Sequence, residues 1–284
     1  MRRHGVTIAK FTVAALIIGL SMSQVYLSLI SIPEAAGDTE AYWQAAQRLR
    51  MGQPLYMQAT DLLATDVYRY APWFAWMWVP LTFLPRDVVE SGWRVAMVGA
   101  TVVALIPLLR NGTLASATAA CLIGWLTLQT ALYGNVQPLL VAGMTWSVDR
   151  RSGPAWIAIA ASLKFVPALY VLVYVARRQW TNVGSFALVA GLLTAPMLLY
   201  DLSSYTTSPG VTPSLYSVHP LLWVVSSVIA SLIALGLARR GSSAGWLGAS
   251  VAVLTAYPQL HMSYASHLLV GTRAPSEPVN GRNG

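Results

Sequence analysis

The sequence predicts an all-helical membrane protein, and three observations carry this prediction. Apolar residues make up 56 % of the 284 residues. Charged residues make up only 10 % of the chain, against roughly a quarter in an ordinary soluble domain, so they are too few to cover a water-exposed surface. The apolar residues also gather in runs close to the ~20 residues that a helix needs to cross a bilayer. We therefore expect an all-α, polytopic transmembrane helical bundle rather than a soluble globule or a disordered chain.

Nine apolar runs follow one another along the chain, and we expect each to be a membrane segment of a single domain, residues 1–271. The first run, 11–32, exceeds the roughly 7–15-residue apolar region of a cleaved signal peptide, so we expect it to be retained. The others are 70–84, 88–109, 114–133, 136–148, 154–176, 183–200, 220–238 and 245–270. The runs 70–84 and 136–148 are short for a crossing, which predicts tilted, kinked or partly inserted segments. Residues 272–284 are expected to form a flexible tail.

The basic residues predict an orientation. The net charge of +8 is spread through an apolar chain, which is typical of residues that flank membrane segments and not of a nucleic-acid-binding patch. Three basic residues precede the first run: Arg2, Arg3 and Lys10. We therefore expect a cytoplasmic N-terminus and an extracytoplasmic loop at 33–69. Alternation from that loop places these residues inside: Arg86, Arg94, Arg177, Arg178, Arg239 and Arg240. It places 149–151, Asp-Arg-Arg, outside, where the basic pair fits the rule poorly.

The loop 33–69 is the one long polar stretch and holds five of the ten acidic residues. It contains a predicted amphipathic helix, 40–51, which ends at the Gly-Gln-Pro sequence 52–54. A helix of this kind beside a membrane segment lies in the interface. The aromatic stretch 68–73 suits the headgroup layer. Carboxylates beside aromatic rings just outside a membrane favour chemistry on a lipid-attached polar substrate.

Two acidic residues compete for the central role in this loop. Asp38 either caps the helix that begins near Glu40, by accepting backbone N–H bonds, or acts as a general base. A general base needs room for a substrate hydroxyl beside the carboxylate. Glu40 is the rival base and otherwise a candidate for substrate binding, although the helix dipole also explains an acidic residue in a first helical turn.

Short motifs along most of residues 1–270 resemble a known family. In the loop and second run these motifs are Gly37-Asp38, Tyr42, Ala46, Gly52, Leu55-Tyr56, Tyr68, Tyr70-Ala71-Pro72, Pro80-Leu81 and Leu84-Pro85. Later motifs are Tyr133-Gly134-Asn135-Val136-Gln137, the stretch 160–167 around Lys164, and the stretch 257–264 around His261. This order resembles the polyprenol-phosphate-mannose-dependent mannosyltransferases, glycosyltransferase family 87 of the GT-C superfamily. The chain is shorter than such enzymes and ends soon after its histidine-containing run.

The resemblance implies a GT-C-like fold and a specific reaction. A hexose, mannose by default, would move with inversion from a polyprenyl-phosphate sugar donor to a glycolipid or polysaccharide acceptor. Asp38 best matches the catalytic carboxylate in the first extracytoplasmic loop and would take the proton from the acceptor hydroxyl. The resemblance also implies a plasma-membrane protein with an extracytoplasmic active site and no cofactor, since the lipid-linked sugar is a substrate.

Two adjacent residues are the first candidates for substrate binding. Arg69 and Tyr70 lie where the outer loop meets the second run. An arginine there holds a phosphate through paired hydrogen bonds, or is only a flanking residue that extends to the interface.

Lys164 lies within an apolar run, where a charge costs about 2.5–3.5 kcal/mol on insertion scales. It has two interpretations. Either its ammonium binds the carbonyl of Leu163, which Pro167 leaves without an amide partner, or it faces the cavity that holds the donor phosphate.

His261 and Tyr264 are three residues apart and would share a helix face after a kink at Pro258, so they are candidates for a sugar or phosphate contact. A hydrogen-bonded core histidine is the alternative. Two histidines six residues apart with no aligned carboxylate make a poor metal site, so we expect no metal. The single cysteine, Cys121, excludes an internal disulfide. Asn135 and Gln137 are interpreted as residues that satisfy an irregular turn.

Two other classes of function remain open at this point. The charged residue within an apolar run and the proline-broken runs are also typical of a transporter or lipid flippase. A non-catalytic, transferase-like membrane subunit would explain the short C-terminus. Replacing Asp38 with Asn discriminates among these classes, because only an enzyme depends on that carboxylate.

Overall fold

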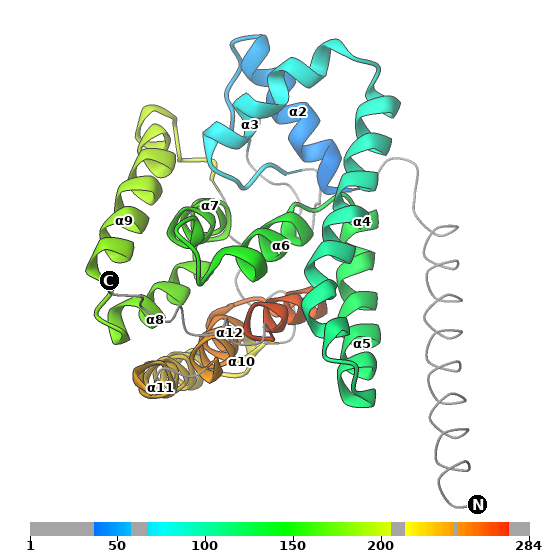
Figure 1. The fold of residues 1–284 in the computed structure, drawn as a ribbon. Helices are drawn as coiled ribbons and strands as arrows, with labels where there is room; N and C mark the ends of the chain where they lie inside the picture. Colours follow the sequence, from blue (N-terminus) through cyan, green and yellow to red (C-terminus); the bar gives the residue numbers. More distant parts are fainter. Residues whose placement is uncertain (1–36, 58–66, 206–213, 241–242, 273–284) are drawn as a thin grey trace, which may run out of the picture.

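The computed structural model describes residues 37–57, 67–205, 214–240 and 243–272. Every regular element in these ranges is a helix (Figure 1), which confirms the all-helical class. The first apolar run, 11–32, lies outside the described residues, as does the expected tail beyond Thr272. The question of a retained first segment therefore stays a prediction.

Four helices in the described ranges are long and apolar enough to cross a membrane. They are α4 (Arg86–Arg110), α5 (Leu114–Leu132), α9 (Trp180–Thr194) with its continuation η3 (Ala195–Leu199), and α11 (Pro220–Arg239). Helix α9 and η3 bury none of their residues, and Leu188, Leu192 and Leu198 are 64 %, 67 % and 84 % exposed. Such a continuous aliphatic face is costly in water and is accommodated by lipid.

Three short helices form a layer at one end of the bundle, here called the α2 end. They are α2 (Asp38–Arg50), α3 (Pro72–Trp78) and η1 (Val79–Phe83). The run 70–84, expected to be tilted, kinked or partly inserted, is not a membrane-length helix but two short helices. Its aromatic side chains instead pack on α2, with the Phe74 ring 4.8 Å and the Trp78 ring 5.2 Å from the Tyr42 ring. Pro80 lies at the change from α-helix to 3₁₀-helix, so the run is too short and too irregular to cross.

Helices α6 (Gln137–Ser147) and α7 (Gly153–Lys164) form a hairpin of two half-length helices. They have 11 and 12 residues, so each is about 17 Å long and could not cross a bilayer alone. Lys164 Nζ, at the end of α7, lies 3.3 Å from Asn135 Oδ1, just before the start of α6. The end of the hairpin therefore lies beside its start. The expected run 154–176 is therefore divided. The chain reverses at Phe165, whose φ is 54°, and continues as η2 (Val166–Tyr170) and α8 (Val171–Ala176).

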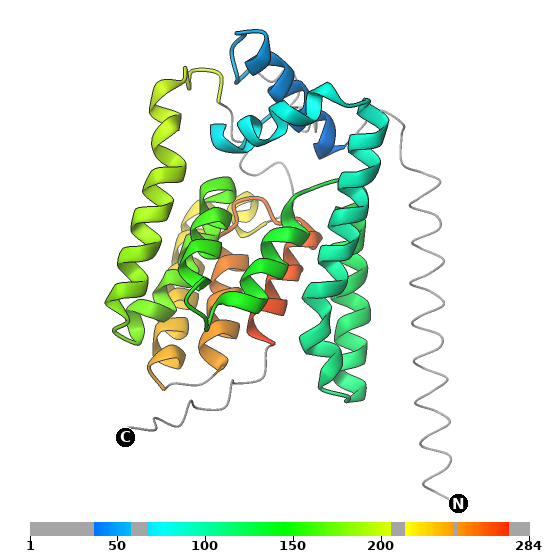
Figure 2. The same ribbon diagram turned by 45° about the horizontal axis from the view of Figure 1, so that its top comes forward.

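The last run, 245–270, is also a hairpin and not one helix. Helix α12 (Ala244–Ala256) and η4 (Met262–Gly271) lie side by side (Figure 2). A Cβ on Gly271 would lie 2.5 Å from the Cα of Leu247, so the end of η4 returns to the start of α12. Pro258 lies in the non-helical link between the two. A short helix α10 (Leu215–Val218) covers this link, where the Ser214 hydroxyl donates to the Pro258 carbonyl at 2.7 Å.

Two contacts correct the sidedness expected from simple alternation. Arg86 forms an ion pair with Glu40, so it lies at the α2 end and not on the opposite side. Asp149 Oδ1 lies 3.3 Å from Arg177 Nη1 and accepts a hydrogen bond from Trp246 Nε1 at 2.8 Å, so these residues share one end. The alternation was wrong because 70–84 does not cross and two later runs fold back.

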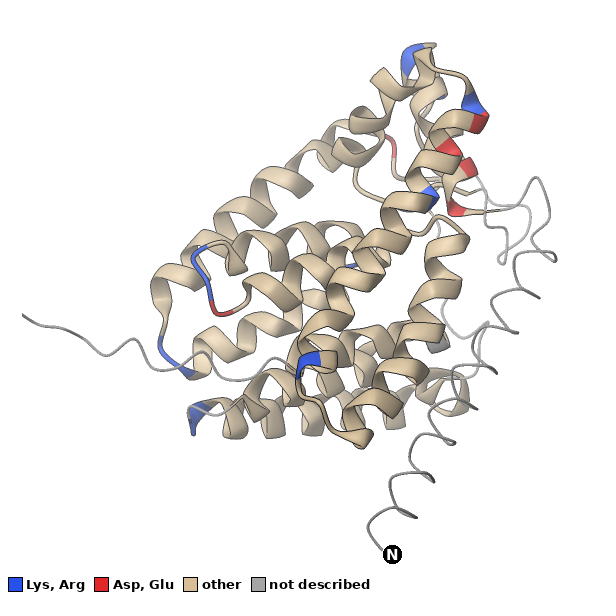
Figure 3. Ribbon diagram, turned by 45° about the vertical axis from the view of Figure 1, so that its right-hand side comes forward, with Lys and Arg blue, Asp and Glu red and all other residues tan. Residues whose placement is uncertain are grey.

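The end opposite α2 is strongly basic, and we call it the basic end. Its arginines lie at the ends of α4, α8 and α11 and in the α6–α7 turn: Arg110, Arg150, Arg151, Arg177, Arg178, Arg239 and Arg240. Asp149 is the one acidic residue of the described chain at this end. Figure 3 shows the remaining acidic residues at or near the α2 end.

Candidate active site

The site forms where the start of α2 meets the turn between α5 and α6. The Asp38 amide donates to the Tyr133 carbonyl at 3.0 Å. Two glycines permit this approach. A Cβ on Gly37 would lie 2.7 Å from the Tyr133 carbonyl oxygen, and a Cβ on Gly134, whose φ is +73°, would lie 2.4 Å from Thr39 Cγ2. The Gly-Asp and Tyr-Gly-Asn motifs are therefore in direct contact.

The Asp38 carboxylate points away from its own helix and into this junction. The helix cap is Gly37, with no side-chain hydrogen bond, so the capping interpretation of Asp38 is wrong. The carboxylate accepts a hydrogen bond from Asn135 Nδ2 at 2.9 Å and a longer one from the Tyr70 hydroxyl at 3.4 Å. Both donors come from other parts of the chain, and they fix the direction of the carboxylate.

Asn135 connects this carboxylate to a cation. Its Oδ1 accepts hydrogen bonds from Lys164 Nζ at 3.3 Å and from the Gln137 amide at 2.8 Å. The second bond is the turn-forming role that the sequence indicates. The bond to Lys164 shows that the Asn135 side-chain amide accepts from the ammonium. The Leu163 carbonyl, which was one of the two expected partners, is not the acceptor in this bond.

Aromatic side chains form one wall beside the lysine. Lys164 Nζ lies 5.1 Å from the centre of the Tyr264 ring, a cation–π geometry. Tyr264 stacks on Tyr257 with ring centres 4.0 Å apart, and the His261 ring meets it edge-on at 5.4 Å. His261 precedes η4 and is not on a shared helix face, yet the predicted pair does remain in contact.

Burial and charge have opposite effects on the central carboxyl group. Burial raises the pKa of Asp38 above its ordinary value of 3.8, because the charged form loses solvation. The positive charge of Lys164 lowers that pKa, as do the hydrogen bonds from Asn135 and Tyr70 and the charge of His261. Burial is the largest effect, so the net pKa is raised. A carboxylate with a raised pKa is a better proton acceptor than an exposed one.

The structure thus brings together most of the predicted site residues, and we call this set the Asp38 site: Asp38, Tyr70, Asn135, Lys164, His261 and Tyr264. Sequence reasoning missed the bridging role of Asn135, which it assigned to the turn alone. It named Tyr42 within the motifs but gave it no role at the site, although this fully buried residue donates its hydroxyl proton to Tyr70 at 3.3 Å and accepts from the Val136 amide at 3.3 Å. The spacing could have identified Tyr42, because it lies four residues after Asp38 on the same face of α2.

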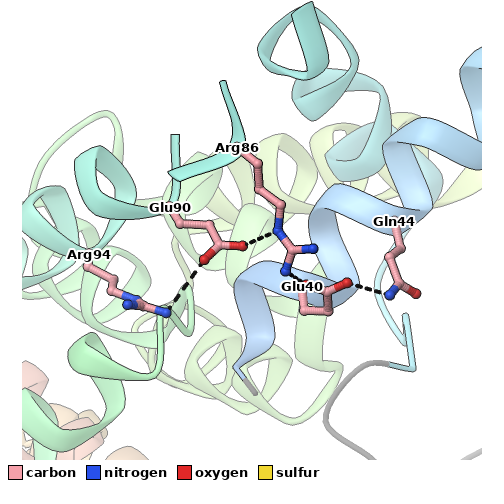
Figure 4. A network of polar contacts seen from close by, with 5 residues as sticks. All are labelled: Glu40, Gln44, Arg86, Glu90 and Arg94. Carbon is pink, nitrogen blue, oxygen red and sulfur yellow. Dashed lines mark hydrogen bonds and ion pairs between the residues drawn. The ribbon is translucent and has the colours of Figure 1, made fainter. Parts of the chain in front are cut away.

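Glu40 lies in a different network, and this argues against its role as the base. Figure 4 shows its carboxylate between Arg86 and Gln44, with contacts to both. Arg86 also pairs with Glu90 at 2.6 Å, and Glu90 lies 3.7 Å from Arg94. This network joins α2 to α4. It holds the helix that carries Asp38, and we assign Glu40 this structural role.

Arg69 lies beside Tyr205, whose hydroxyl donates to the Arg69 carbonyl at 3.2 Å. It neighbours Tyr70 in the chain, and its proposed phosphate contact stays a prediction. In the described ranges, no group of three or more His, Cys, Asp or Glu side chains is arranged to hold a metal ion.

The site can therefore accept a proton at a partly buried carboxylate while a cation lies beside it. The resemblance to family 87 depends on the short motifs alone. No family model, curated protein or solved structure matches the chain.

Proposed function

We propose that this chain is a membrane glycosyltransferase. It would move a hexose, by resemblance mannose, from a polyprenyl-phosphate sugar to a glycolipid or polysaccharide acceptor. The observation that carries the proposal is the pairing of a partly buried carboxylate with an ammonium through one amide: Asp38 and Lys164 both bind Asn135. All six residues of the Asp38 site lie in the motifs that carry the resemblance, and this supports the family-like reaction over an unrelated one.

The chemistry uses the two charges in separate roles. Asp38 accepts the proton of the acceptor hydroxyl as its oxygen attacks the anomeric carbon of the sugar. The bond from that carbon to the phosphate oxygen breaks, the polyprenyl phosphate leaves from the opposite face, and the configuration inverts. Lys164 stabilises the charge that develops on the leaving phosphate. General-base assistance contributes roughly 10²–10⁴ in rate, and the rest comes from holding both substrates in line.

The charge distribution supports an extracytoplasmic site. Positively charged segments between membrane helices favour the cytoplasm, and the basic end carries the arginines of the α6–α7 turn and of the ends of α4, α8 and α11. With that end inside, the Asp38 site faces outward.

The test is complementation of a strain that lacks the gene, followed by analysis of its glycolipids. Wild-type protein restores the missing hexose, whereas Asp38→Asn does not, because the amide cannot accept the proton. Asp87→Asn is the matched control, since Asp87 is exposed at the same end. Restoration by the Asp38→Asn variant at normal membrane levels would refute the proposal.

A transporter or flippase for an anionic lipid is the second candidate, and one observation favours it. Helix α7 ends at Lys164 inside the bundle and the chain reverses there, and α12 also stops short. Broken helices around a central charge are typical of transporters. A flippase would keep its function in Asp38→Asn and lose it in Lys164→Met. A transferase that needs its base would instead lose more activity in Asp38→Asn than in Lys164→Met.

A further inference from the structure

A hollow lies between α4, α6 and α7, and none of its lining residues belongs to the Asp38 site. Its volume is about 280 Å³. The residues that line it come from these three helices and the α6–α7 turn: Val103, Leu139, Ala142, Gly143, Trp146, Ser147, Arg150, Ser152 and Trp156. We call this hollow the α6–α7 groove. The proposed transferase mechanism does not use it.

The groove has an apolar part and a polar mouth. Val103, Leu139 and Ala142 supply the apolar part, whereas Arg150 and Ser152 lie in the turn at the basic end. Val103 is seven residues before the end of α4 at Arg110, or about 10 Å along the helix axis. The groove thus leads from the charged end of the bundle into its membrane-facing side.

Two tryptophans and a glycine shape the walls. Trp146 Nε1 donates to the Val103 carbonyl at 2.8 Å, which fixes one indole against α4. A Cβ on Gly143 would lie 2.1 Å from the Trp156 ring, so only glycine lets the second indole lie against the α6 backbone. Indole rings at the boundary of a membrane bundle are typical of the headgroup layer.

Positive charge surrounds the mouth. Arg150 is exposed, and the Arg110 guanidinium lies 5.8 Å from the centre of the Trp146 ring. No acidic residue is among the residues that line the groove. The neighbouring acid, Asp149, is directed to Arg177 and Trp246. The field at the mouth therefore favours an anion, and the apolar part beneath it favours a hydrocarbon chain.

We propose that the α6–α7 groove binds an anionic phospholipid of the bilayer. One acyl chain lies along Val103, Leu139 and Ala142, and the phosphate meets Arg150 and the Ser152 hydroxyl. An arginine between membrane helices at a basic face is suited to a lipid headgroup. The proposal does not depend on the reaction at Asp38.

The test measures binding of phosphatidylglycerol to the purified full chain in detergent, by native mass spectrometry. Wild-type protein retains phosphatidylglycerol in preference to phosphatidylcholine. Arg150→Gln weakens retention roughly tenfold, the effect of losing one charge-assisted hydrogen bond. Arg151→Gln is the matched control, because Arg151 is its exposed neighbour outside the groove and its loss changes binding less than twofold.

Two further arms separate a lipid site from other sites. Val103→Trp fills the apolar part from the exposed side of α4 and reduces lipid retention with both arginines intact. Inorganic phosphate at millimolar concentration does not displace the lipid. Equal effects of Arg150→Gln and Arg151→Gln, equal retention of phosphatidylcholine, or displacement by inorganic phosphate would each overturn the proposal.

Discussion

Asn135 holds the two charged groups of the site, the Asp38 carboxylate and the Lys164 ammonium, apart from each other and in fixed positions. Its amide donates to Asp38 and accepts from Lys164, so neither charged group has to contact the other directly. A direct ion pair would stabilise the ionised carboxylate and weaken it as a base. The bridge leaves the carboxyl pKa above its ordinary value while a cation remains near the leaving group.

The Lys164 charge is expected to set the acidic limb of the pH–rate profile. Transfer requires ionised Asp38, so the rate rises with pH through the pKa of that carboxyl group. The ammonium lowers this pKa, so Lys164→Met moves the acidic limb to higher pH as well as slowing the reaction. Lys164→Arg keeps the charge and leaves the limb in place. A limb that does not move in Lys164→Met would show that the two groups are not coupled.

Asp38 is also expected to make wild-type stability depend on pH. Because its pKa is higher in the folded than in the unfolded chain, where it is about 3.8, the folded state binds more protons between these two values. Stability contributed by this group is therefore lost as pH rises through that window. The melting temperature of Asp38→Asn relative to wild type should rise over the same window. A difference that is constant with pH would contradict the raised pKa.

At the scale of elements, the junction between α2 and the α5–α6 turn positions the base. Gly134 has a φ of +73° and leaves no room for a Cβ beside Thr39, whereas Gly112 has a φ of +63° with open space around it. Alanine substitutions at these two glycines therefore distinguish the cost of backbone strain, which both carry, from the effect of crowding at the site, which only Gly134 carries.

Gly134→Ala is expected to reduce transfer more than tenfold, because the methyl group forces the turn and Asn135 away from Asp38. Gly112→Ala carries only the left-handed backbone cost, about 1–2 kcal/mol, and keeps its activity. Thermal melting and transfer rates of the two variants measure this difference. Equal activity of the two would mean that the contact between the turn and α2 is not needed.

The sequence predicts some of these elements and misses others for physical reasons. Long apolar runs predict α4, α5, α9 and α11, because each run is long enough to span the hydrocarbon core of a bilayer as one helix. Length does not show that 154–176 reverses at Phe165, a residue with no local signal for a positive φ. The cost of a charge within an apolar run indicates that Lys164 is special, but its link to Asp38 through Asn135 is visible only in the structure. The Glu40–Arg86 pair joins residues on two helices, and no spacing rule reports such a contact.

For the whole molecule, the position of 70–84 at the α2 end and the folding back of two later runs change which residues share a side. The basic end collects the arginines, and the α2 end collects most of the acids of the described chain (Figure 3). Positively charged ends favour the cytoplasm. The structure therefore fits the charge rule better than simple alternation, which placed 149–151 and Arg177 on opposite sides.

Cysteine labelling in intact cells is expected to show this sidedness. In a Cys121→Ser background, a membrane-impermeant maleimide labels exposed positions at the α2 end, introduced as Asp87→Cys and Asp201→Cys. Exposed positions at the basic end, Arg151→Cys and Arg240→Cys, react only after the membrane is permeabilised. Labelling of position 87 only after permeabilisation would place the α2 end, and with it the Asp38 site, in the cytoplasm, and would contradict the proposed orientation.

The most direct measurement of the central proposal is hexose transfer by the purified protein in liposomes. A polyprenyl-phosphate mannose donor labelled in the sugar is supplied with a glycolipid fraction from the deletion strain. The wild type is expected to release polyprenyl phosphate and form a mannosylated lipid with inverted anomeric configuration, while Asp38→Asn reduces both by roughly 10² or more. Equal transfer by Asp38→Asn, or a product with retained configuration, would contradict the role of Asp38 as the base.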